Sequence, residues 1–193
     1  MIIDITTNLF VILFFFASLC VYIYRVFKEE RTRLRYFVVV SFIFYIIALV
    51  KVVLFPIFIF DKELISKIYE GSEKYIRFYQ FIPFASIKDY FSAETIIQLI
   101  GNVFLLFPLV IYVDLFSKGK YKIIKLVMFG VCSSLLIEIY QLLTNFITKF
   151  PGHLADIDDF LLNSIGVLFA AGVIAIIRKK KKFITKLLWV SKS

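Results

Sequence analysis

Histidine, cysteine, proline and glycine are all scarce in this chain of 193 residues. His153 is the single histidine, so a zinc site built on histidine ligands is excluded. The sequence contains no Ser-His-Asp set, glycine-rich phosphate loop or nucleotide-binding motif. Cys20 and Cys132 lie within apolar stretches, where we expect buried apolar side chains and no disulfide. With four prolines and seven glycines, the chain has no low-complexity linker, which favours one domain over residues 1–193.

Apolar residues make up 61% of the chain, and 24 residues are phenylalanine. Soluble domains contain roughly 45–50% apolar residues, so the composition predicts an integral membrane protein. Because an unsatisfied backbone group in lipid costs several kcal/mol, we expect long apolar stretches to be helical. A spanning helix needs about 20 apolar residues. Five stretches meet this requirement with at most one charge each: 5–24, 36–60, 95–113, 126–148 and 160–177. The predicted fold is all-α, a bundle of about five transmembrane helices.

Lysine and arginine are unevenly distributed between these spans. Segments 25–35, 117–125 and 178–193 hold most of the 23 basic residues and few of the 14 acidic ones. Basic loops stay in the cytoplasm, so the topology is predicted to be N-out and C-in. Residues 178–193 then form a basic cytoplasmic tail, expected to contact anionic lipid rather than nucleic acid. The first span is expected to remain as an anchor, since no small-residue cleavage pattern follows it.

The segment between the second and third spans, residues 61–95, mixes charged and aromatic residues. On the predicted topology it is extracytoplasmic. We expect an amphipathic segment lying at the membrane interface, with a break at Pro83.

The fourth span carries polar residues on one helix face. Ser134, Glu138, Gln141 and Asn145 are spaced by four, three and four positions. An ionised carboxylate at the centre of a membrane helix costs roughly 2.5–3.5 kcal/mol on insertion scales, so Glu138 is a functional candidate. Alternatively, Glu138 is protonated, or it pairs with Lys51 near the outer end of the second span in a structural contact.

Three aspartates, Asp156, Asp158 and Asp159, stand where the fifth span begins. The helix dipole favours a negative charge there by about 0.3–1 kcal/mol, so capping explains one or two of them. Three carboxylates also repel one another, and Lys51 or a bound divalent cation would relieve that repulsion. Oxygen ligands suit Mg²⁺ or Ca²⁺, so Asp156, Asp159 and Glu138 are candidate metal ligands.

The polar face of the fifth span continues inward through Asn163. Gly166 and Ala170 extend it with small side chains, which suit close helix packing. Near the outer end of the third span, Gln98 and Asn102 lie four residues apart. Four spans are therefore predicted to direct polar groups toward one region of the outer leaflet.

Four sequence segments resemble the VanZ-like family of bacterial membrane proteins, which is named for a teicoplanin resistance protein. The segments are "FIPF" (81–84), "IGNVFLLFPLV" (100–110), "SSLLIEIYQLL" (133–143) and "GHLADIDDFLLNSIG" (152–166). The resemblance covers about residues 40–177. The recurrent polar residues of the family fall, by position, on Asn102, Glu138, Gln141, Asp156, Asp158, Asp159 and Asn163.

The chain departs from the family pattern at two positions. Val110 stands where the family usually has glycine, two residues after the proline of the third span. His153 stands where an arginine commonly precedes the aspartates. If that arginine neutralises the acidic cluster or binds an anion, Lys149 or Lys51 would have to supply the positive charge here.

The resemblance implies a cell-envelope protein of the bacterial plasma membrane that lowers susceptibility to teicoplanin and related lipoglycopeptides. It would act through a polar outer-leaflet site between the third, fourth and fifth spans. Its expected partners are membrane lipids and either a lipoglycopeptide drug or a lipid-linked cell-wall precursor. The ligand-binding candidates are Lys51, Asn102, Glu138, Gln141, Asp156, Asp158, Asp159 and Asn163.

Two other functions stay open on the sequence. One is a metal-assisted enzyme acting on a lipid phosphate, with Glu138 as general acid or base and Mg²⁺ or Ca²⁺ as the cofactor. The other is a proton-coupled transporter, which is the least favoured because no inverted repeat is visible. The sequence favours a binding role over an enzyme and leaves the oligomeric state open.

Overall fold

The computed structural model describes residues 2–3, 33–71, 77–85 and 93–180. The chain divides into two compact units, one built mainly from residues 57–179 and the other from residues 2–56 with 180–193. The predicted first span, 5–24, lies outside the described residues, together with Cys20 and all but the first three residues of the basic tail. Each unit is described below by itself.

The unit formed by residues 2–56 contains the short strand β1 (Ile2–Ile3) and the helix α2 (Arg33–Leu54). Helix α2 corresponds to the predicted second span, 36–60, but ends at Leu54. Pro56 accounts for the earlier end, because proline has no N–H and disfavours helical backbone in the residue before it.

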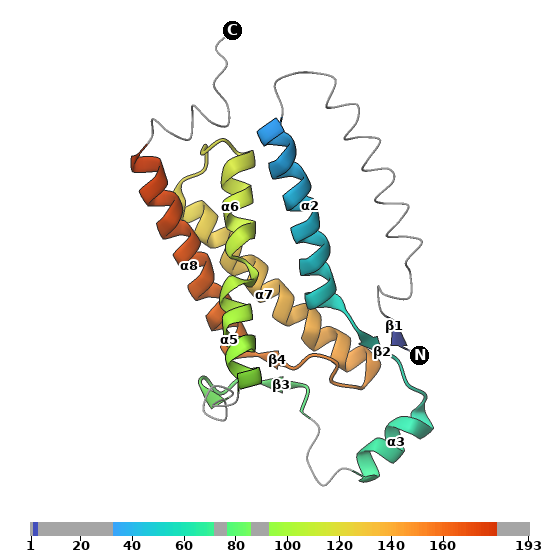
Figure 1. Ribbon diagram of the computed structural model, residues 1–193. Coiled ribbons are helices and arrows are strands. Elements are labelled where there is room, and N and C mark those ends of the chain that lie inside the picture. Colours follow the sequence, from blue (N-terminus) through green and yellow to red (C-terminus); the bar gives the residue numbers. More distant parts are fainter. Residues whose placement is uncertain (1, 4–32, 72–76, 86–92, 181–193) are drawn as a thin grey trace. The chain divides into compact units, whose positions relative to one another are not determined.

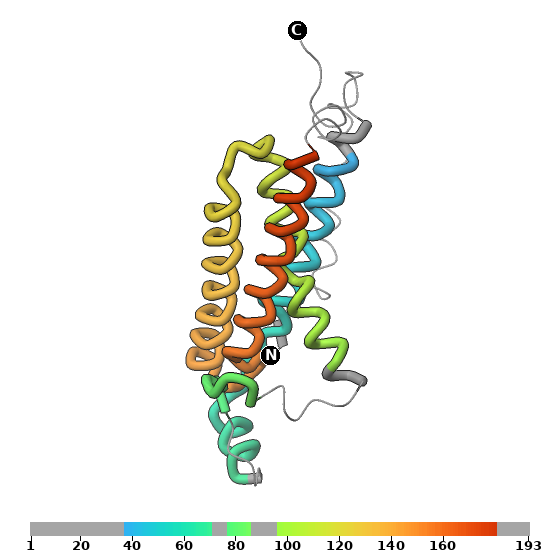
Figure 2. The backbone as a smooth tube through the Cα atoms, turned by 90° about the vertical axis from the view of Figure 1, so that its left-hand side faces the viewer, coloured from blue at the N-terminus to red at the C-terminus, as the bar shows by residue number. Residues whose placement is uncertain are grey.

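The larger unit contains the other three predicted spans as neighbouring helices (Figures 1 and 2). Helix α8 packs against α5, α6 and α7. With α2, these elements form four helical stretches of the described chain that are long and apolar enough to cross a membrane. The prediction of a multi-pass helical membrane protein is confirmed. The bounds are α5 (Ala93–Leu105), α6 (Phe107–Phe116), α7 (Ile123–Thr148) and α8 (Ile157–Lys179).

The third span is interrupted, although the sequence analysis predicted one helix over residues 95–113. Helix α5 ends at Leu105, and α6 begins at Phe107 with Pro108 in its first turn. A proline ring inside a continuous helix would clash with the carbonyl group of the preceding turn and would remove one hydrogen bond. The helix therefore restarts at the first position where proline is tolerated, the beginning of α6.

Small residues allow the helices of the larger unit to approach closely. A Cβ atom built on Gly166 would lie 1.7 Å from the carbonyl oxygen of Val103, so α8 touches the backbone of α5. Ala170 is fully buried, so the predicted packing role of Gly166 and Ala170 is confirmed. Val110, which departs from the family pattern, is fully buried against Gly130 of α7. The glycine of α7 makes room for the larger side chain on α6.

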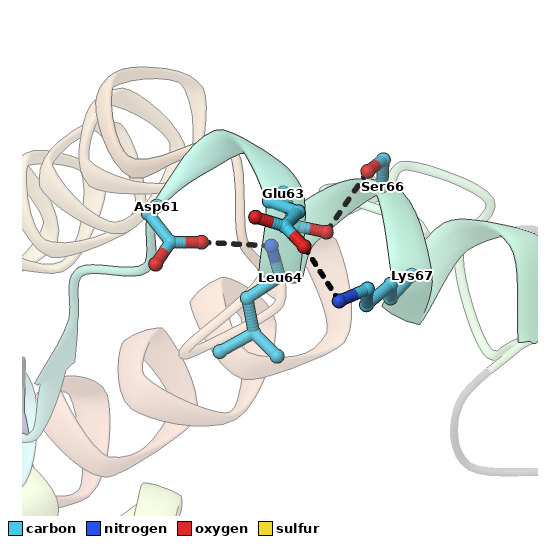
Figure 3. Close-up of polar contacts among 5 residues, drawn as sticks. All are labelled: Asp61, Glu63, Leu64, Ser66 and Lys67. Atoms are coloured by element: carbon cyan, nitrogen blue, oxygen red, sulfur yellow. Dashed lines mark hydrogen bonds and ion pairs between the residues drawn. The ribbon is translucent and has the colours of Figure 1, made fainter.

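The strand β2 (Ile57–Phe58) precedes the predicted amphipathic segment, 61–95, which begins with the amphipathic helix α3 (Lys62–Gly71). Asp61 caps α3, because its Oδ1 atom accepts the backbone N–H of Leu64 at 2.7 Å (Figure 3). Glu63 and Lys67, one helical turn apart in α3, form an exposed ion pair at 2.7 Å. The predicted amphipathic segment therefore contains an amphipathic helix, and its extracytoplasmic, interfacial position stays a prediction.

Two short strands lie at the end of the bundle where α8 begins (Figure 1). Strand β3 (Tyr79–Gln80) pairs in parallel with β4 (Ala155–Asp156), so that Tyr79 is opposite Ala155 and Gln80 is opposite Asp156. The chain then turns at Pro83, as predicted, and Phe84 adopts a φ of 63°. This pairing places residues 79–84 beside the aspartates of residues 156–159.

The opposite end of α8 is fixed by Arg178. Its guanidinium group forms an ion pair with Asp114 of α6 and donates a second hydrogen bond to the carbonyl oxygen of Tyr121 at 2.8 Å. Gly119, with a φ of 69°, lies against the same guanidinium group. The C-terminal turn of α8 is thereby joined to the connection between α6 and α7.

Candidate functional site

Glu138 lies inside the bundle, on the face of α7 that meets the start of α8. Its side chain is 8% exposed. The Oε2 atom accepts the backbone N–H of Asp156 at 2.9 Å. The carboxyl groups of Asp156 and Asp159 lie within electrostatic range of Glu138. The structure therefore brings together the carboxylate of the fourth span and the aspartates of the fifth.

Asp156 and Asp158 have identifiable structural roles. The Oδ1 atom of Asp156 accepts the backbone N–H of Asp158 at 2.8 Å, and α8 begins at Ile157, so Asp156 is the N-cap. Asp158 is 1% exposed, and its Oδ1 atom accepts the backbone N–H of Phe84 at 2.6 Å. Capping, one of the explanations weighed for the aspartates, accounts for Asp156.

Asp159 is held differently, by a side chain of another helix. Its Oδ1 atom accepts a hydrogen bond from the side-chain amide of Asn102 on α5. The carboxyl groups of Asp156 and Asp158 lie within electrostatic range of Asp159. Neither Asp159 nor Glu138 forms an ion pair with a described residue of its own unit. The carboxyl groups of Asp159 and Glu138 are therefore contacted by hydrogen-bond donors and by no cation among the described residues of this unit.

Two buried amide oxygens lie on the same helix faces. Asn163 is 1% exposed, and its Oδ1 atom has no hydrogen-bond partner among the described residues. The Oε1 atom of Gln141 is also buried without such a partner. Leaving a buried acceptor unpaired costs about 1–3 kcal/mol. Asn163 follows Asp159 by one helical turn, and Gln141 follows Glu138 by one turn.

We use the name acceptor cluster for the four residues whose oxygen atoms share these faces. The cluster is built by α7 and α8, with Asn102 of α5 bonded to one of its carboxylates. Its members are Glu138, Gln141, Asp159 and Asn163.

Asn145 and Ser134 lie on the same face of α7, as predicted, and both are buried. The side-chain amide of Asn145 donates to the carbonyl oxygens of Phe78 and His153, at 3.1 and 2.6 Å, and accepts the N–H of Gly152 at 3.1 Å. Asn145 therefore joins the chain before β3 to the loop before β4. Its partners are all backbone groups, so its role is structural.

Three other polar or reactive residues lie elsewhere. Gln98 is exposed on α5, although Asn102 one turn later reaches Asp159. Lys51 lies in the last turn of α2, in the other unit, and its pairing with Glu138 stays a prediction. Cys132 is exposed, so the prediction that it is buried was wrong. Helix α7 turns Cys132 away from α8, because Cys132 lies two residues before the inward-facing Ser134.

The backbone N–H of Phe84 was not anticipated from the sequence as a contact of the acidic residues. On the sequence, "FIPF" (81–84) has no role beyond the family resemblance. The one local signal for this contact is Pro83. Proline favours a turn, and a turn leaves backbone N–H groups that a carboxylate can accept.

No group of three histidine, cysteine or acidic residues is arranged to hold a metal ion in the part of the chain that the structure describes. Within the candidate set Glu138, Asp156 and Asp159, one oxygen of each carboxylate accepts a hydrogen bond from a protein donor. The arrangement offers acceptor oxygens to a ligand.

Comparison with known proteins gives one result at the level of the family. The family model described as VanZ/LLP1 matches residues 42–178, which is most of the chain and close to the predicted range of 40–177. No curated protein and no solved structure matches the chain significantly. The matched range contains every residue of the acceptor cluster together with the aspartates of residues 156–159. This chain therefore belongs to the VanZ/LLP1 family and is a VanZ-like multi-pass membrane protein, with a link to glycopeptide resistance at the level of the family.

Proposed function

We propose that this protein acts in the bacterial plasma membrane and lowers susceptibility to lipid-tailed glycopeptides such as teicoplanin. The acceptor cluster would engage the drug, or the lipid-linked wall precursor that the drug recognises. The predicted N-out topology puts the start of α8, and so the cluster, on the outer side of the membrane. Family membership supports the proposal at the coarser level of glycopeptide resistance.

The observation that carries the proposal is the buried Glu138 beside Asp159. Two carboxyl groups within membrane-spanning helices, with no cationic partner among the described residues of their own unit, are costly to retain for packing alone. The unpaired oxygens of Gln141 and Asn163 add to that cost. Groups that destabilise a fold in this way are characteristic of binding sites, where a ligand supplies the missing partners.

The alternative of a metal-assisted enzyme acting on a lipid phosphate needs a bound cation. Without one, the carboxylates would repel the phosphate group. Its supporting observation is that all the available acceptors are oxygen atoms, which suit Mg²⁺ or Ca²⁺. The two functions differ in their dependence on divalent cations, and the experiment below separates them.

The test is susceptibility to teicoplanin and vancomycin in a deletion strain that carries the wild-type protein or a variant. We expect the wild type to protect against teicoplanin more than vancomycin. Glu138→Gln and Asp159→Asn should abolish that protection at membrane levels equal to the wild type. Gln98→Ala is the matched control, because Gln98 is an exposed polar residue of the same bundle.

Three results would contradict the proposal. Full protection by Glu138→Gln would mean that the carboxylate is not required. No teicoplanin effect of the wild type would leave the resistance function without support. If the wild-type protein stops protecting against teicoplanin when divalent cations are limited during growth, the metal-assisted enzyme is favoured instead.

A further inference from the structure

The acceptor cluster has an imbalance between hydrogen-bond acceptors and donors. The Oε2 atom of Glu138 and the Oδ1 atom of Asp159 each accept one hydrogen bond. The second oxygen of each carboxylate accepts none from a residue that the structure describes. These two groups therefore offer carboxyl oxygen atoms to whatever occupies the site.

Asn163 provides an independent indication that a ligand is missing. Its side chain is 99% buried, yet the Oδ1 atom is unpartnered among the described residues. Asp159, one turn earlier, and Gly166, one turn later, both contact α5, so the Asn163 side chain shares the face that carries the cluster. A buried amide oxygen and two carboxyl groups on adjoining faces favour a ligand group that donates several hydrogen bonds.

A protonated primary amine matches this requirement. An ammonium group carries three N–H donors, no acceptor and one positive charge. A phosphate carries acceptors and negative charge, so it mismatches the cluster in both respects. A hydroxyl group donates only one hydrogen bond and leaves the carboxylate charges unneutralised.

The chemistry around the cluster indicates that the amine belongs to an amphiphile. The cluster lies between membrane-spanning helices. The adjoining turn exposes Tyr79, Phe81 and Phe84, which are 49%, 56% and 58% exposed. Aromatic and apolar side chains at the ends of membrane helices lie in the lipid interface. A ligand with an apolar chain in the bilayer could place its polar end beside Asp159.

We infer that the acceptor cluster binds the protonated primary amine of an amphiphile. The inference rests on the proposed function for the identification of the cluster as the working site. It adds the chemical class of the group that is recognised.

The test uses the full-length protein in phosphatidylcholine nanodiscs, since that lipid has no N–H donor. The thermal unfolding midpoint is measured with four probes that share one alkyl chain: dodecylamine, dodecyltrimethylammonium, dodecyl phosphate and dodecanol. Dodecylamine should raise the midpoint by several degrees at saturation, because a ligand that binds the folded state stabilises it. Dodecyltrimethylammonium carries the positive charge but no N–H donor. It should raise the midpoint by less than a third of the rise that dodecylamine gives.

Variants assign the effect to the cluster. Glu138→Gln and Asp159→Asn should each remove most of the dodecylamine shift, whereas Gln98→Leu should keep it. Asn163→Leu should raise the midpoint of the ligand-free protein and reduce the amine shift. If Asn163 had only a structural role, Asn163→Leu would lower the midpoint of the ligand-free protein. This variant therefore tests the inference even if Glu138→Gln and Asp159→Asn fold poorly.

The source of the amine is tested by replacing part of the phosphatidylcholine with phosphatidylethanolamine. If a lipid headgroup is the ligand, the starting midpoint rises and the dodecylamine shift shrinks. If an amine of another molecule is required, neither value changes.

Equal stabilisation by dodecyl phosphate or by dodecyltrimethylammonium would overturn the inference. Stabilisation by Mg²⁺ or Ca²⁺ in place of the amine would overturn it too. Amine binding without teicoplanin protection would contradict the proposed function alone. Protection without amine binding would contradict this inference alone.

Discussion

Gly166 on α8 lies directly against the carbonyl oxygen of Val103 on α5, where an added Cβ atom would be 1.7 Å from that oxygen. The clash would be with backbone, which cannot rotate away, so Gly166→Ala must separate the two helices. We expect a loss of about 1–3 kcal/mol of stability, the usual cost of overpacking. The fall in the thermal unfolding midpoint in nanodiscs measures this loss of stability.

Gly172 is the matched control on the same helix. A Cβ atom there would meet nothing within 4 Å. Gly172→Ala should be neutral or should stabilise α8 by about 0.5–1 kcal/mol through the better helix propensity of alanine. Equal effects of the two substitutions would show that α5 and α8 are not in close contact.

Two substitutions at Glu138 separate its structural contact from its charge. The carbonyl oxygen of Gln can still accept the N–H of Asp156, so Glu138→Gln should accumulate in the membrane at close to wild-type levels. Glu138→Leu leaves that buried N–H without its partner and should cost about 1–3 kcal/mol. Measurement of thermal stability and membrane level for both variants tests this difference. If the Leu variant is the more stable one, the hydrogen bond to Asp156 is not important for the fold.

Asn145 is expected to fix the loop before β4 to the chain before β3. Asn145→Ala removes three hydrogen bonds to backbone groups, so residues 77–85 should exchange their amide hydrogens faster. Hydrogen exchange measured by mass spectrometry reports this change directly. Thr144→Ala is the control, since the Thr144 hydroxyl group bonds only to Tyr140 in its own helix. Similar exchange in both variants would mean that Asn145 does not fix β3.

Arg178 should stabilise the end of the bundle opposite the acceptor cluster. The ion pair with Asp114 is partly exposed, so Arg178→Ala should cost about 1–2 kcal/mol, between the values for exposed and buried pairs. Arg178→Lys should recover only part of the loss, because one ammonium group cannot reproduce the two-pronged contact with Asp114 and Tyr121. The thermal unfolding midpoints of the two variants measure the loss and its recovery. Full recovery of stability in Arg178→Lys would show that charge attraction alone accounts for the contact.

The helices of the bundle were predictable because lipid requires every backbone group to be paired within the helix. The spans ending at Thr148 and Lys179 lie close to the stretches expected from hydropathy. The shared face of Ser134, Glu138 and Asn145 followed from helical spacing, and burial of all three agrees with it. Periodicity along one helix is a local property, which a sequence displays directly.

The break at Leu106 could have been expected from Pro108, but apolar composition alone gave a continuous span. The pairing of β3 with β4 and the contact between Phe84 and Asp158 join segments more than 70 residues apart. No local pattern specifies which distant backbone group meets which carboxylate. Asp156 caps α8 through the nearby N–H of Asp158, whereas Asp158 and Asp159 differ from it through distant partners, Phe84 and Asn102. The sequence therefore placed the three aspartates together without distinguishing them.

The position of α8 between α5, α6 and α7 also constrains the order in which the protein can mature. The ribosome makes α8 after the other three helices. Until it arrives, Glu138 and Ser134 on α7 lack their contacts with Asp156 and Phe160, and Asn102 lacks Asp159. Polar groups of two inserted helices would then face lipid or the insertion machinery for the time needed to synthesise some thirty residues, at about 5–20 residues per second. Biogenesis of this protein is thus expected to depend on whatever shelters α7 during those seconds.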